Sequence, residues 1–281
     1  MLVNPEPIAE SKTEVSQALP GIGYGFLTLM KMQLLSALVI LPFAIASVLT
    51  GVKHLVMHPL VALLGVLFAA GWIIRGYCRK NSLKLTELAG PLTLFPGLLW
   101  AMAAAVIGLL MIEVPIGLWL IARFPFLEPK FDFDVAQSPW AAFLIIVVAA
   151  PLTEEFLFRG ILLRSFIPRY GRKGAILVSA IFFSLAHLYP VKLLGMLAAG
   201  MLLGWVAARV GSVWPGVWAH AFNNGIAFAS MIFAKVETPR ATWQQLGWWW
   251  AVALVLAGAI ILSLSIYAAQ RATARLPRPT S

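Results

Sequence analysis

The segment from Thr153 to Gly160 reads Thr-Glu-Glu-Phe-Leu-Phe-Arg-Gly and places three charged side chains inside an apolar stretch. No charged residue occurs from 140 to 152, and residues 160–163 are again apolar. An ionisable group held in hydrocarbon costs several kcal/mol unless it is paired or hydrated, so such residues indicate function. The segment is therefore the first candidate for a chemical site.

The three charges divide naturally into a pair and a free carboxylate. Glu155 and Arg159 are four residues apart, so a helix places them on one face, where their charges attract. Glu154 points about 100° away from Glu155 and is left to face a cavity as a general base. Alternatively, all three charges serve only to hold helices together, although two glutamates and one arginine are an expensive means of doing so.

Two further polar groups lie in apolar segments closer to the C-terminus. His187 ends the sequence Phe-Ser-Leu-Ala-His and is either a hydrogen-bonded helix residue or a group that orients a water and shares its proton. His220 and Asn224 are four residues apart and so face the same side of a helix. A neutral imidazole and an amide can donate two hydrogen bonds to a developing oxyanion. The alternative is interhelical hydrogen bonding, worth about 0.6–2 kcal/mol.

The composition shows what kind of element must position these residues. The 281 residues are 61% hydrophobic and 11% charged, with a mean hydropathy of +0.89. This excludes a water-soluble domain and is typical of a polytopic helical membrane protein. The net charge of +10 reflects Lys and Arg at the ends of apolar segments, which we attribute to topology and the lipid bilayer rather than to nucleic acid. The single cysteine excludes an internal disulfide and a cysteine-based zinc site.

The apolar segments predict an all-α bundle of about eight transmembrane helices, since a bilayer core of about 30 Å requires about 20 apolar residues in a helix. We expect one membrane domain over residues 1–281, with polar tails at 1–28 and 269–281. Lys and Arg concentrate on the side that is cytoplasmic if both termini are inside, so cytoplasmic termini are predicted. The predicted spans are Gln33–Thr50, Pro59–Ile74, Leu94–Ile121, Trp140–Leu163, Gly174–Tyr189, Val191–Ala208, Val213–Phe233 and Leu246–Ala268.

These spans place the polar residues at one level in the membrane. At a rise of about 1.5 Å per residue, Glu154, His187 and the pair on the seventh span all lie near the midplane. Unrelated structural residues have no reason to share a depth. The sequence therefore predicts a single site, formed by three helices within residues 140–233.

The three motifs, taken in order, resemble those of a known family. It is the CAAX prenyl protease and bacteriocin-processing (CPBP, or Abi) family of intramembrane endopeptidases, whose eukaryotic member is the type II CAAX prenyl protease. The resemblance covers roughly residues 140–233. It implies an eight-helix bundle with a polar cavity open to the cytoplasm, and hydrolysis of peptide bonds in or near the membrane. The motifs are Glu154-Glu155-x-x-x-Arg159, Phe183-x-x-x-His187 and His220-x-x-x-Asn224.

The resemblance also implies roles for the site residues. Glu154 and His187 would activate a water, His220 and Asn224 would stabilise the oxyanion, and the Glu–Arg pair would hold the shape of the site. The family has been described both as metalloproteases and as glutamate proteases that need no metal. Glu154, His187 and His220 would supply three ligands to zinc, whereas a carboxylate, a histidine and an oxyanion hole suffice without it. We favour the metal-free interpretation, with no cofactor required.

The sequence thus predicts an intramembrane endopeptidase acting on a membrane-associated or C-terminally lipidated protein. Two other functions stay open: a non-catalytic membrane scaffold or bacteriocin-immunity protein, and a proton-coupled transporter. No inverted repeat supports transport. The expected partners are a protein or peptide substrate and the lipid bilayer, without nucleic acid, and the expected location is a bacterial cytoplasmic membrane.

Overall fold

A computed structural model describes residues 20–52, 58–127, 135, 138–187, 189–233, 239–274 and 276. Every regular element in these residues is a helix, which confirms the all-α prediction. The α-helices are α2 (Ile22–Thr50), α4 (Pro59–Lys80), α5 (Leu85–Ala89), α6 (Pro96–Arg123), α7 (Pro139–Phe143), α8 (Ala150–Glu155), α9 (Arg164–Ala186), α10 (Leu193–Val210), α11 (Trp214–Phe233) and α12 (Pro239–Ala272). Two π-helices, η3 (Leu144–Ala149) and η4 (Phe156–Leu163), and two short 3-10 turns, η1 (Pro125–Leu127) and η5 (Pro190–Lys192), complete the set.

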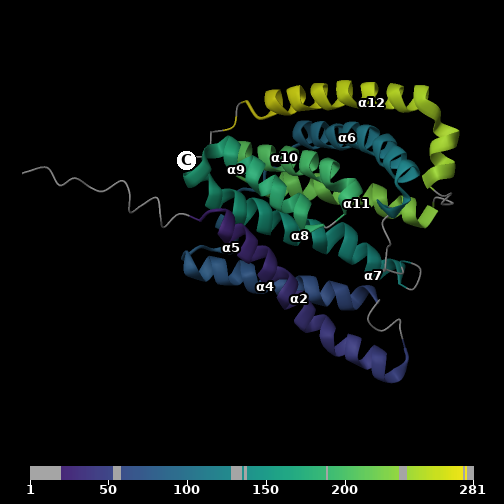
Figure 1. The fold of residues 1–281 in the computed structure, drawn as a ribbon. Helices are drawn as coiled ribbons and strands as arrows, with labels where there is room; N and C mark the ends of the chain where they lie inside the picture. The colour runs from purple at the N-terminus through teal and green to yellow at the C-terminus, as the bar shows by residue number, and fades with distance from the viewer. Residues whose placement is uncertain are drawn as a thin grey trace, which may run out of the picture.

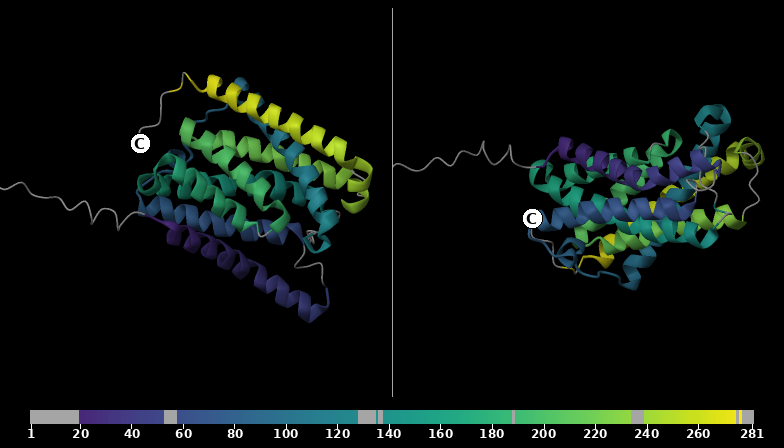
Figure 2. Two further views of the ribbon diagram at one scale, coloured as in Figure 1. Left: turned by 45° about the horizontal axis from the view of Figure 1, so that its top comes forward. Right: turned by 90° about the horizontal axis from the view of Figure 1, so that it is seen from below.

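The long helices form three layers (Figure 1). Helices α12 and α6 lie side by side along one flank, and α2 and α4 pair along the opposite flank. Between them lie α8, α9, α10 and α11, and two further views show the same order (Figure 2). The three motifs lie on α8 with η4, at the end of α9, and on α11. The central layer is therefore shielded on both flanks by helix pairs.

The outer helices expose apolar side chains as a bilayer requires. Phe26, Leu38 and Trp72 are each more than half exposed, together with many similar residues, and a water-soluble surface rarely presents so large an apolar area. Six helical segments in the described residues are long and apolar enough to cross a membrane. One of them, Pro139–Ala186, is broken at Gly171 (φ 65°) and so covers the predicted span Trp140–Leu163 and most of the predicted span Gly174–Tyr189. Helix α11 is less apolar because of its polar residues, and including it brings the number of candidate membrane spans close to the predicted eight. The chain is an integral multi-pass membrane protein.

Several helices extend beyond the predicted spans. Helix α2 begins at Ile22 rather than Gln33 and takes in residues 22–28 of the predicted N-terminal tail. Lys31 lies within this helix, since one exposed lysine does not interrupt the backbone hydrogen bonds of a helix. Helix α12 likewise begins at Pro239, breaks at Gly247 (φ 68°), and continues to Ala272, inside the predicted C-terminal tail.

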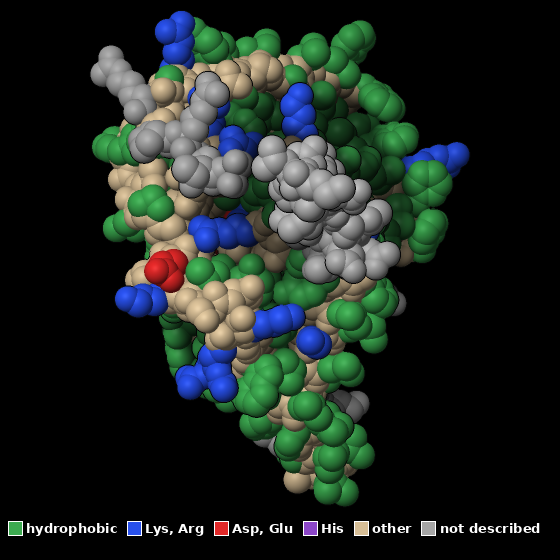
Figure 3. Space-filling model, turned by 90° about the vertical axis from the view of Figure 1, so that its left-hand side faces the viewer, with side chains coloured by type: hydrophobic (Ala, Val, Ile, Leu, Met, Phe, Trp, Pro, Cys, Tyr) green, Lys and Arg blue, Asp and Glu red, His purple; other side chains and the backbone are tan. Residues whose placement is uncertain are grey.

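Lys and Arg side chains gather at one end of the bundle (Figure 3). The start of α2 and the end of α12 both lie at that end (Figure 1). This is the distribution that the positive-inside rule expects if both ends of the chain face the cytoplasm. The cytoplasmic orientation of the termini stays a prediction.

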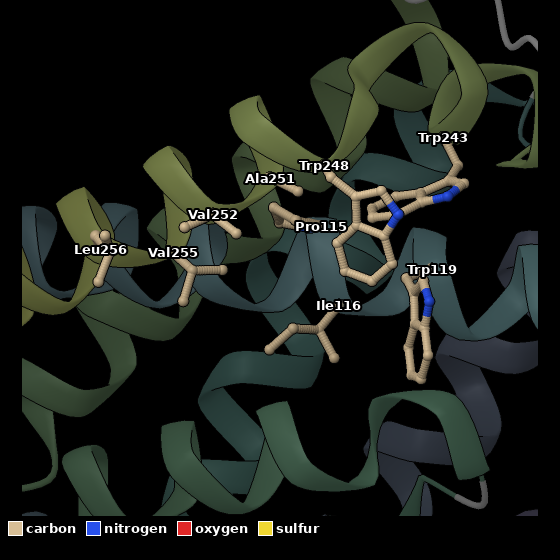
Figure 4. A pocket seen from close by; sticks show the side chains of 9 residues that line it. All are labelled: Pro115, Ile116, Trp119, Trp243, Trp248, Ala251, Val252, Val255 and Leu256. Carbon is tan, nitrogen blue, oxygen red and sulfur yellow. The ribbon is translucent and has the colours of Figure 1, made fainter.

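Helices α6 and α12 touch through their backbones at two glycines. A Cβ added to Gly108 would lie 2.8 Å from the carbonyl oxygen of Gly258, and one added to Gly258 would lie 2.6 Å from that of Gly108. Close to Pro115 the two helices leave an apolar cavity of about 280 Å³, where Trp119 and Trp248 face each other (Figure 4). No residue of the three motifs lines this cavity, so it is separate from the candidate site.

We expect Gly108→Ala to lower the thermal unfolding midpoint of the detergent-solubilised protein, because the added methyl group would overlap the backbone of α12. Overpacking of this kind costs about 1–3 kcal/mol. Gly117 lies on the same helix with open space around it, so Gly117→Ala should leave the midpoint unchanged or raise it slightly, since alanine favours a helix. Equal midpoints for the two variants would contradict the close backbone contact.

Candidate active site

The helix that carries the first motif alternates between α and π geometry. It runs through α7, the π-helix η3, α8 and the π-helix η4 before it enters α9. Glu154 and Glu155 are the last two residues of α8, and Arg159 lies in η4. Wider i→i+5 bonds leave some carbonyl groups without a backbone donor, and π segments are frequent at functional sites. The sequence predicted one regular span and gave no signal of this alternation.

Carbonyl oxygens of the two π segments accept hydrogen bonds from neighbouring helices. The Asn224 amide nitrogen donates to Ile146 O in η3 at 2.8 Å. The Ser179 hydroxyl donates to Phe158 O in η4, also at 2.8 Å. These bonds tie α11 and α9 to the helix of the first motif, on either side of α8.

The Glu155 and Arg159 side chains form an ion pair that is inaccessible from outside. Arg159 Nη1 donates to Glu155 Oε1 at 2.8 Å, and the two side chains are 1% and 0% exposed. Arg159 Nη2 donates to Gly200 O on α10 at 3.2 Å, and the guanidinium lies 4.5 Å from the ring centre of Phe183 on α9. Charges removed from water need such additional partners. The contact of Arg159 with the Phe183 ring was not predicted from the sequence.

Two glycines let helices pack closely at and around this pair. A Cβ added to Gly216 on α11 would lie 2.6 Å from Glu155 Oε2. A Cβ added to Gly200 would lie 3.0 Å from the Cβ of Ala180 on α9. Gly216 was missed by sequence reasoning, since a glycine near the start of a helix gives no signal of what lies opposite.

Both histidines present Nε2 to the same glutamate oxygen. His220 Nδ1 lies 3.1 Å from Glu155 Oε1, and His187 Nδ1, at the end of α9, lies 2.8 Å from Phe183 O. Carboxylate and carbonyl oxygens only accept hydrogen bonds, so both Nδ1 atoms carry the proton. The Nε2 atoms of His187 and His220 lie 3.6 Å and 3.9 Å from Glu154 Oε2. The Phe183 ring packs edge-on against both imidazoles.

The site therefore has a buried layer and an accessible layer. The Glu154 and His187 side chains are 22% and 23% exposed, whereas His220 is 7% exposed and the ion pair beneath it is fully buried. The structure thus brings three sequence-distant motifs together. The Glu154 and His187 side chains are partly exposed, but Glu154 Oε2, the oxygen that faces both histidines, is buried and has no hydrogen-bond partner among the described residues.

Asn224 and His220, the two residues expected to stabilise an oxyanion, differ in the N–H groups that they have left to donate. An amide nitrogen carries two N–H groups, and the bond of Asn224 to Ile146 uses one of them. A neutral His220 has one N–H, and Glu155 accepts it. A neutral imidazole was expected to donate to the oxyanion, but in this geometry His220 can donate from Nε2 only as an imidazolium.

The described residues include no ready-made zinc site, and whether the site uses a metal is not decided by them. Among them, no group of three His, Cys, Asp or Glu side chains is placed to hold a metal ion. Glu154 lies near both histidines, yet the three together do not form such a group. We therefore derive no chemical step through a metal, and the metalloprotease interpretation receives no support from the arrangement.

Gly216→Ala is expected to lower the thermal unfolding midpoint, because the new methyl group would collide with the buried carboxylate of Glu155. The expected loss is about 1–3 kcal/mol. Gly225 is the matched control on the same helix, since a Cβ there would meet Val147 at an ordinary 3.9 Å. Thermal unfolding in detergent checks both variants, and a Gly216→Ala midpoint no lower than that of Gly225→Ala would refute the contact.

Comparison with known proteins bears on the same region. Residues 136–226 match a family model described as Type II CAAX prenyl endopeptidase Rce1-like. No curated protein matches the chain, and no solved structure matches it. The matched residues contain all three motifs and nearly coincide with the predicted range 140–233, so the resemblance drawn from the motifs is confirmed. Residues 136–226 of this chain are thus similar to the type II CAAX prenyl endopeptidase Rce1-like family.

Proposed function

We propose that the protein is an intramembrane endopeptidase in which Glu154 and His187 activate a water molecule. The observation that carries the proposal is the approach of His187 Nε2 and His220 Nε2 to one oxygen of Glu154, at 3.6 Å and 3.9 Å. The three side chains come from different helices and lie within apolar segments. The endopeptidase description of the matching family supports the same function.

The first step follows from the hydrogen-bonding capacity of the accessible pair. Glu154 Oε2 and His187 Nε2 are both acceptors when the imidazole proton is on Nδ1. A water that bridges the Glu154 carboxylate and the His187 imidazole from their accessible side donates one O–H to each, and its lone pairs then face a peptide carbonyl carbon. Glu154 takes the proton as general base while the oxygen attacks. The same carboxyl group then protonates the leaving amine, so that no net proton is consumed.

Stabilisation of the tetrahedral intermediate is assigned to Asn224 and His220. The second N–H of Asn224 donates to the oxyanion, and an imidazolium form of His220 adds a second donor. A preorganised donor of this kind is worth about 100- to 1,000-fold in rate. Glu155, paired with Arg159, orients the imidazole of His220 through its Nδ1 atom. Neither residue takes part in bond making or breaking.

The substrate class follows from the setting of the site. A peptide bond reaches the site only from a chain that is itself associated with the bilayer, so we propose a membrane-associated or C-terminally lipidated protein or peptide as the substrate. A bacterial cytoplasmic membrane is the proposed location. The lipid bilayer is the second partner, since the flanking helices expose apolar side chains along their length.

Glu154→Gln should abolish cleavage while the protein still accumulates, because an amide cannot take a proton from water. We expect a rate at least about 100-fold lower. The measurement maps new peptide termini across the membrane proteome of cells that express wild type or variant at matched levels. Glu113→Gln is the control, since Glu113 is another glutamate in a membrane-spanning helix, α6, and lies outside the three motifs.

Termini that appear with wild type and with Glu113→Gln, but not with Glu154→Gln, would establish proteolysis and name the substrate. If wild type and Glu154→Gln give the same termini while wild type alters the cells, the protein acts by binding rather than by cleavage. Flux of protons or solutes through purified protein in liposomes would instead indicate transport.

Cleavage by the purified protein should persist after treatment with a strong zinc chelator, because the proposed chemistry uses only the side chains of the chain itself. The measurement is the rate of cleavage of an identified substrate before and after chelation, with metal content determined on the same sample. Loss of activity that zinc restores stoichiometrically would overturn the metal-free mechanism and leave the assignment of the site residues intact.

A further inference from the structure

The π-helix η3 ends at Ala149, two residues before Pro151, and the proline removes one backbone donor. The N–H of Ala150 donates to Ile145 O, in the i→i+5 pattern of the π-helix. The next bond in that series would run from the N–H of residue 151 to Ile146 O. Residue 151 is proline, which has no N–H. The carbonyl oxygen of Ile146 therefore lacks the backbone N–H donor that residue 151 would supply in a regular π-helix.

The Asn224 side chain supplies the missing donor. Its amide nitrogen lies 2.8 Å from Ile146 O, and its amide oxygen accepts from the Asn223 side chain at 3.2 Å. A carbonyl group within an apolar segment strongly favours such a partner. Because both ends of the Asn224 amide are then engaged, its nitrogen cannot exchange places with its oxygen, and the second N–H has a set direction.

We infer that Pro151 is a positioning residue of the oxyanion hole, which acts by keeping Ile146 O available to Asn224. The inference rests on the function proposed above for Asn224. Any residue other than proline at 151 would bring an N–H that competes for Ile146 O. Asn224 would then lose its anchor for part of the time, and the oxyanion would lose a preorganised donor.

The contact itself can be tested without any activity measurement. In the wild-type background, Asn224→Ala leaves Ile146 O without a donor and should lower the thermal unfolding midpoint. In a Pro151→Ala background the new N–H at 151 satisfies that carbonyl, so Asn224→Ala should lower the midpoint much less. Equal losses in the two backgrounds would show that residue 151 and Asn224 do not share the carbonyl, and would overturn the inference.

The catalytic consequence is tested on an identified substrate. Pro151→Ala should lower kcat about tenfold, with KM and the thermal midpoint not reduced, since alanine adds a hydrogen bond to the helix. On an Asn224→Ala background the same change should have no further effect on kcat. Pro168, an exposed proline inside α9 away from the site, is the matched control, and Pro168→Ala should keep the wild-type kcat.

The outcomes separate this inference from the proposed function. An unchanged kcat in Pro151→Ala, or a loss that multiplies with that of Asn224→Ala, would overturn the positioning role while cleavage by wild type stands. If wild type cleaves no more than Glu154→Gln, the proposed function fails. The stability comparison would in that case still decide whether Pro151 directs Asn224 to Ile146.

Discussion

The ion pair between Glu155 and Arg159 is the interaction on which the arrangement of the site depends. Within the central layer of helices a charge has to be satisfied by protein groups. Glu155 accepts from Arg159 and from His220, and Arg159 also donates to Gly200 O and packs on the Phe183 ring. These partners lie on α9, α10 and α11, so one buried pair sets how three helices meet the helix that carries it.

A second constraint comes from the backbone of that helix. In a bilayer, peptide groups that lack an internal partner are costly, and a helix normally satisfies them all. The π segments on either side of α8 depart from this rule, and side chains of α9 and α11 complete the bonding at Phe158 O and Ile146 O. The π segments thus provide carbonyl groups to which side chains of other helices bond specifically. Such bonds fix the register between helices, which apolar contact alone specifies poorly in a membrane.

These two constraints explain why the reactive groups can be partly exposed. Beneath them, Glu155 Oε1 and both terminal nitrogens of Arg159 are hydrogen-bonded within the protein, whereas Glu155 Oε2 and Arg159 Nε have no partner among the described residues. His187 contributes to this bonding only through its Nδ1 contact. The Glu154 and His187 side chains are 22% and 23% exposed, although Glu154 Oε2 itself is buried. The same organisation distinguishes His220, whose neutral form is committed to Glu155, from Asn224, which keeps a donor available.

The sequence by itself determined the helical class, the approximate number of spans and the pairing of residues four apart, because length, hydropathy and helical period are local properties. Glu155 with Arg159 is such a pair, and the motifs were enough to indicate the family. Only the tertiary structure decided that Glu155 also holds His220, that Gly216 must lack a side chain, and that Asn224 binds Ile146 O. These contacts join residues from 61 to 78 positions apart in the chain. They depend on the register between helices and on a change from α to π geometry. Hydrogen bonds between helices set both features, and no local sequence pattern indicates either of them.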